Sequence, residues 1–91
     1  MKIFVVILTY LKPLSEVEKY LESHIVFLDK YYASNNFIVS GKRSPRVGGV
    51  ILCRFSSLEE AQKVFKEDPF SVQGIAEYNI VEFEASKGLK L

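Results

Sequence analysis

Apolar residues recur at spacings of three and four along residues 14–34, which is the pattern of an amphipathic helix. The residues that share this face are Val17, Leu21, Leu28 and Tyr31. The chain's single histidine, His24, falls in the same series, midway between Leu21 and Leu28. An imidazole on the apolar face of a helix is either a core side chain whose hydrogen bond is satisfied or a functional residue that lines a pocket. The pattern leaves both interpretations open.

The segment before this helix predicts a strand that is apolar on both faces. It covers residues 2–10, where Ile3, Val5 and Ile7 alternate with Phe4, Val6 and Leu8. A strand of this kind must be covered on both sides. Helices of the same chain can cover one face, and we expect a second copy of the chain to cover the other.

Turn and cap signals divide the rest of the chain. Ser15 and Glu18 predict a capping box at the start of the first helix, and the asparagines at 35–36 predict a left-handed stop at its end. A second helix is expected to begin after Ser57 and to end at Asp68, because the residue before Pro69 avoids helical angles. Asp68 is also suited to cap a short helical turn that starts at Pro69 and closes at Gly74.

Three more strands are predicted over residues 37–41, 49–55 and 77–84, with a charged loop between the first two. The order strand, helix, strand, strand, helix, strand is that of the α+β, ferredoxin-like βαββαβ fold. We therefore expect a four-stranded antiparallel sheet with both helices on one face, in a single domain over residues 1–91.

Composition narrows the classes of function. The net charge of +1 gives no field that would attract nucleic acid or an anionic membrane, and residues 50–53 lack the aromatic platform of RNA-binding sheets. The apolar run 3–8 is too short for a membrane span of about 20 residues or a signal segment of about 7–15. The single cysteine, Cys53, excludes an internal disulfide and fits a reducing cytoplasm. One histidine and one cysteine also argue against a zinc site, so we expect no metal, no cofactor, no nucleic acid and no membrane partner.

Several short motifs stand in a fixed order along the chain. They are HIVFL at 24–28, FIVSG at 37–41, PRVGGVIL at 45–52, SLEEA at 57–61, DPF at 68–70 and GIAEY at 74–78, followed by Ile80. This ordered set, which covers nearly the whole chain, resembles the YciI-like, or YCII-related, family. The resemblance implies a dimeric α+β barrel in which two ferredoxin-like sheets pack face to face. It also implies an active site with a histidine and an aspartate, matched here by His24 and Asp68.

The resemblance leaves the reaction open. Most family members have no established reaction, and a few relatives act on chlorinated aromatic rings. Lys42 follows Ser40 and Gly41 where many members have proline, which bears on the shape of the pocket.

His24 and Asp68 are the candidate catalytic residues. A carboxylate bonded to one ring nitrogen fixes the imidazole tautomer and frees the other nitrogen to act as an acid or a base. The alternative is a structural pair that ties the first helix to the end of the second.

Ser40, Gly41, Arg46 and Phe70 are the candidate substrate-binding residues. Each has a structural alternative: a strand end for Ser40 and Gly41, a solvated hairpin tip for Arg46 with Lys42 and Arg43, and a hydrophobic staple for Phe70.

Three further residue types carry weaker expectations. Arg54 is expected to pair with Glu82 or Glu84 across strands. Cys53 is expected to be a buried, inert thiol. The tyrosines, Tyr78 among them, are boundary residues or pocket hydroxyls.

Two functions from different classes remain. The first is a small homodimeric enzyme that uses His24 and Asp68 for cofactor-free acid–base chemistry on a small unsaturated or aromatic molecule. The second is a non-catalytic dimer that binds a small ligand or has a structural role.

Overall fold

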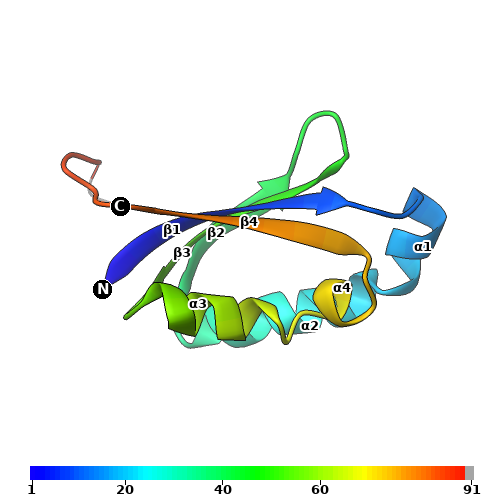
Figure 1. Cartoon of the computed structure of the whole chain (residues 1–91), viewed down its shortest axis with the longest axis horizontal. Coiled ribbons are helices and arrows are strands. Elements are labelled where there is room, and N and C mark those ends of the chain that lie inside the picture. The colour runs from blue at the N-terminus through cyan, green and yellow to red at the C-terminus, as the bar shows by residue number, and fades with distance from the viewer. Residues whose placement is uncertain (90–91) are drawn as a thin grey trace.

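The computed structural model describes residues 1–89, which form one antiparallel sheet with helices on one face (Figure 1). The strands are β1 (Lys2–Tyr10), β2 (Phe37–Lys42), β3 (Gly48–Phe55) and β4 (Ala76–Phe83), in the spatial order β2-β3-β1-β4. The helices are α1 (Leu14–Lys19), α2 (Leu21–Ala33), α3 (Leu58–Phe65) and α4 (Pro69–Val72). The predicted α+β fold and antiparallel sheet are therefore confirmed.

The core lies between the helices and the inner face of the sheet. β1 is one of the two inner strands, and its residues Phe4, Val6 and Leu8 are buried under the helices. Ile3, Val5 and Ile7 on the same strand are only half buried, because they point to the face that no helix covers. One apolar face of β1 therefore packs under the helices, as the sequence pattern predicts. The other apolar face points away from them.

The predicted helix over residues 14–34 is two helices, which is a correction to the sequence interpretation. The chain leaves helical geometry at Tyr20, with φ −113° and ψ 4°, and α2 restarts there when the His24 amide donates to the Tyr20 carbonyl over 2.9 Å. No proline or glycine marks the break. Tyr20 instead packs partly buried against the core, so that Val17 of α1 and His24 of α2 both face inward.

The predicted Ser15–Glu18 capping box is wrong. The N-cap residue is Pro13, two residues before Ser15, so the helix begins at Leu14 and no side chain caps it. The carbonyl of Pro13 accepts from the amides of Glu16 and Val17, so Ser15 lies inside the first turn.

The other predicted caps and turn ends are confirmed, but α3 ends at Phe65 and not at Asp68 as predicted. A turn follows it, in which the amides of Glu67 and Asp68 donate to the carbonyls of Val64 and Phe65. Asn35 has a left-handed φ of 63° after α2, and the Ser57 hydroxyl accepts from the Glu60 amide over 3.1 Å at the start of α3. Asp68 caps α4 by accepting from the Phe70 amide over 3.1 Å, with Pro69 in the first turn. Gly74, with φ 65°, closes the turn before β4.

The predicted ion pair of Arg54 with Glu82 or Glu84 is wrong, because β1 lies between β3 and β4. The Arg54 Nε atom donates to the Asn35 carbonyl over 2.8 Å instead. Glu82 pairs with Lys2 on the neighbouring strand, over 3.4 Å.

Candidate functional site

Asp68 and His24 meet beneath the sheet, although 44 residues separate them in the chain. The His24 Nδ1 atom lies 2.8 Å from Oδ1 of Asp68, whose side chain is fully buried. A carboxylate only accepts hydrogen bonds, so Nδ1 carries the proton in this pair. The neutral ring therefore presents Nε2 as a free lone pair, which is the form that can accept a proton.

The α4 turn supplies both contacts that hold the His24 ring. Asp68 stands at its N-cap, and Phe70, two residues on, stacks on the imidazole with ring centroids 4.1 Å apart and planes 6° apart. The Phe27 ring also lies near the imidazole, with ring centroids 6.3 Å apart. The local preference of Asp-Pro for a helix start thus places an acceptor and an aromatic plane around one histidine.

Three donors converge on the buried carboxylate of Asp68. Besides His24 Nδ1, Oδ1 accepts from the Phe70 amide, and Oδ2 accepts from the Tyr78 hydroxyl over 2.5 Å. Such bonds replace the hydration that a buried charge loses. Burial, together with the adjacent Asp68 carboxylate, raises the pKa of the Tyr78 phenol above its ordinary value, so Tyr78 remains a donor at neutral pH.

A cavity of about 320 Å³ lies at the exposed end of this arrangement. His24 lines it together with Leu8, Tyr10, Leu21, Ile25, Leu28, Ser40, Gly41, Lys42, Arg46, Gly48, Gly49, Val50 and Ile51. Its volume is at the lower end of the range of small-molecule pockets, and its lining is mostly apolar. His24 itself is 9% exposed, so the imidazole is a wall residue of the cavity and not a surface group.

The cavity also gathers three of the four predicted substrate-binding residues, namely Ser40, Gly41 and Arg46. Phe70 does not line it and contacts His24 from behind. The Ser40 hydroxyl bonds the Tyr32 hydroxyl over 2.6 Å, and within residues 1–89 no hydrogen bond joins it to His24.

Arg46 carries a buried polar atom without a partner. Its Nε is the one buried side-chain nitrogen or oxygen in residues 1–89 that forms no hydrogen bond. Its Nη1 atom lies 3.8 Å from a carboxylate oxygen of Glu18. An unpaired buried N–H is costly, so a ligand acceptor that reaches it gains that energy. The neighbouring Arg43 is already bound, because it donates to the Thr9 hydroxyl over 2.9 Å.

Cys53 lies outside the site. Its thiol is fully buried in β3, and burial raises its pKa to about 12. In the described part of the chain, no group of three or more His, Cys, Asp or Glu side chains is placed to hold a metal ion.

Tyr78 is the member of the site that the sequence did not single out. It was one of five tyrosines with no distinguishing signal, since its contact with Asp68 depends on where β4 returns beneath α4. Periodicity along β4 places Tyr78 on the helix side of the sheet, but it does not reveal that Asp68 accepts the hydrogen bond of its hydroxyl.

A family model for the YCII-related domain matches residues 3–84. The chain belongs to the YCII-related domain family. A search of curated proteins finds no match to it. Membership confirms the resemblance that the ordered motifs carry. Within residues 1–89, no helix combines the length and apolar character needed to cross a bilayer.

The structure is similar to that of a YCII-family enzyme. This neighbour is the 5-chloro-2-hydroxyhydroquinone dehydrochlorinase TftG from Burkholderia phenoliruptrix AC1100, solved in complex with 2,5-dihydroxybenzoquinone. The TM-score is 0.76 over 94% of this chain and 95% of that chain, at 16% sequence identity. The similarity confirms the fold.

Proposed function

We propose that this YCII-related protein is an enzyme in which His24 transfers a proton to or from a small unsaturated or aromatic molecule, without a cofactor. The observation that carries the proposal is the fixed His24 tautomer at the cavity wall, with Nδ1 committed to Asp68. Nε2 then acts as base, and the imidazolium formed is stabilised by the carboxylate.

Arg46 is the proposed anchor for an oxygen of the substrate. Its unpaired buried Nε–H and its position in the cavity that His24 also lines suit a phenolate, enolate or quinone oxygen. Ser40 and Gly41 are proposed to shape the cavity, and Phe70 to hold the His24 ring. The aromatic and quinoid compounds named for TftG are therefore the first probes to use.

The test is to screen hydroxyhydroquinones, their chlorinated forms and small carbonyl compounds with the wild type, His24→Asn and Arg46→Gln. Asparagine retains a donor for Asp68 but has no titratable nitrogen, so we expect a folded protein with turnover reduced about 100-fold or more. Arg46→Gln is expected to raise KM. Full turnover by folded His24→Asn would exclude His24 from the mechanism.

The non-catalytic alternative has its own signature. If 2,5-dihydroxybenzoquinone or a related compound binds wild type and Arg46→Gln weakens that binding, while no compound is turned over, the cavity serves ligand binding alone. The partial enclosure of His24, 9% exposed, suits such a role equally well.

We also propose that the open face of the sheet pairs with a second copy of the chain in the cytoplasm. This face is apolar: Val81 and Phe83 on β4 are 43% and 42% exposed, beside the half-buried Ile3 and Val5 on β1. Such a patch is unusual on a monomer. We expect a dimer by sedimentation at micromolar concentration, converted to monomer by Val81→Lys but not by Val72→Lys on the exposed side of α4. A wild-type monomer would overturn the proposal.

A further inference from the structure

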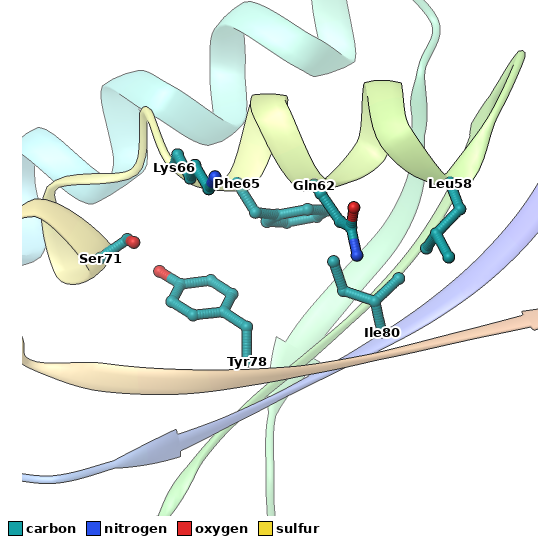
Figure 2. Close-up of a pocket in the computed structure, with 7 residues that line it drawn as sticks. All are labelled: Leu58, Gln62, Phe65, Lys66, Ser71, Tyr78 and Ile80. Atoms are coloured by element: carbon teal, nitrogen blue, oxygen red, sulfur yellow. The ribbon is translucent and has the colours of Figure 1, made fainter.

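A groove of about 430 Å³ runs between α3 and β4, and none of its lining residues lines the His24 cavity. Figure 2 shows Tyr78 and Ile80 rising from β4, with Phe65 and Gln62 of α3 across from them. Leu58 stands at one end and Ser71 of α4 at the other. The groove is therefore a separate concave surface, large enough for a small aromatic molecule.

The groove has an apolar body and a polar end. Leu58, Phe65 and Ile80 supply apolar surface. Lys66 is the charged residue of the lining, and its ammonium group forms no ion pair with any residue in the range 1–89. Lys66, Ser71 and the Tyr78 hydroxyl lie toward the same end of the groove (Figure 2). This arrangement complements a molecule with a flat apolar part and one anionic group.

Tyr78 joins this groove to the His24 site. Its ring lines the groove, and its hydroxyl donates to Oδ2 of Asp68, whose Oδ1 accepts from His24. A phenol has a single proton to donate. An anionic oxygen held by Lys66 and Ser71 would compete with Asp68 for that proton. The Asp68 carboxylate, with one donor fewer, would then depend more on its bond to His24.

We propose that the α3–β4 groove is a second ligand site, which binds a small aromatic carboxylate with its carboxylate at Lys66 and Ser71 and its ring against Phe65 and Ile80. Occupancy of the groove is relayed to His24 through the Tyr78–Asp68 hydrogen bond. The inference does not rest on a reaction at His24, because binding and its relay are measured without turnover.

The experiment is an NMR titration of the full-length protein with benzoate, with benzamide as the uncharged probe. We expect benzoate to shift the amide signals of Gln62, Lys66 and Ser71 saturably, and benzamide to bind about 3- to 5-fold more weakly. Lys66→Gln should weaken benzoate binding by the same factor. Lys63→Gln is the matched control: Lys63 lies on α3, which Lys66 follows directly, pairs with Glu59 over 3.7 Å and is absent from the groove, so binding should be unchanged.

The relay is read from the imidazole nitrogen signals of His24. Benzoate should shift them in the wild type and in Arg46→Gln, and should leave them unchanged in Tyr78→Phe. Two results would overturn the proposal: benzoate shifts confined to the His24 cavity and lost in Arg46→Gln, or equal affinity for benzoate in Lys66→Gln and wild type. Groove binding without any change at His24 would overturn the relay.

Discussion

The imidazole of His24 lies parallel to the ring of Phe70, 4.1 Å away, while the residue that begins the same turn, Asp68, bonds its Nδ1 atom. One four-residue helix, α4, thus fixes both the plane and the tautomer of the histidine. The orientation of the ring is set by aromatic contact and its proton by the carboxylate. These two effects can be separated by substitution.

Phe70→Leu tests the contribution of the aromatic plane. We expect a loss of about 1–2 kcal/mol in the free energy of unfolding, from the smaller side chain and the lost ring pair. We also expect turnover or ligand affinity to fall further than this loss explains, because the His24 ring gains freedom. Phe55→Leu is the control, because Phe55 is equally buried but does not contact His24. The free energy of unfolding measured in urea should fall in this variant, while ligand affinity should stay unchanged.

The Asp68–Pro69 cap was predictable from sequence because its preference is local. Asp accepts from the amide two residues on, and Pro favours the first turn, whatever surrounds them. The contact of this cap with His24 depends on the packing of α2 against α4, so only the family resemblance suggested it. Tyr78 depends on a third element, β4, and neither periodicity nor motif indicated its bond to Asp68.

Asp68→Asn tests the tautomer. The amide retains the size of the carboxylate but carries no charge. With its oxygen at the Oδ1 position it can still accept from His24 Nδ1 and the Phe70 amide, whereas its NH₂ group at the Oδ2 position cannot accept from Tyr78. A neutral amide oxygen is a weaker acceptor than a carboxylate, so it holds the proton on Nδ1 less firmly. We expect about 1–3 kcal/mol of destabilisation and a mixture of imidazole tautomers in place of the Nδ1–H form. The nitrogen chemical shifts of His24 distinguish the two forms. An unchanged Nδ1–H signal would show that Asp68 does not select the tautomer.

The break at Tyr20 and the partner of Arg54 show where pattern analysis fails. The apolar spacing continues across Tyr20, so periodicity joins α1 and α2 even though the backbone turns there to fit Val17 and His24 onto the same core. The partner of Arg54 depends on the order of the strands in the sheet, which the spacing of charged residues does not show. Arg54 was expected beside the last strand, and the insertion of β1 between β3 and β4 separates them.

Cys53 predicts a dependence of stability on pH in the alkaline range. Burial raises the pKa of its thiol from 9.0 to about 12. Between these values the unfolded chain releases the thiol proton and the folded chain keeps it, so the free energy of unfolding falls as pH rises. We expect this group to contribute a slope of up to about 1.4 kcal/mol per pH unit. Below the unfolded pKa the contribution is complete and constant.

The measurement is urea denaturation of wild type and Cys53→Ala at several values between about pH 8 and about pH 11. Tyrosines titrate in both proteins, so the difference between the two curves isolates the thiol. The variant should be less stable at neutral pH, because a buried side chain is truncated, and the gap should narrow as pH rises. A constant gap would mean that the thiol titrates alike in both states.

Two glycines of the β2–β3 hairpin differ in the space available for a side chain. A Cβ atom on Gly48 would lie 1.8 Å from the carbonyl oxygen of Leu8, in the strand that β3 pairs with, whereas a Cβ atom on Gly41 meets nothing within 4 Å. Gly48→Ala must therefore push β3 away from β1 at the edge of the His24 cavity. We expect a loss of about 2–4 kcal/mol in the free energy of unfolding. Gly41→Ala should change it by less than about 0.5 kcal/mol. Thermal and urea denaturation of the pair decide the matter, and equal stability of the two variants would contradict the close packing of β1 on Gly48.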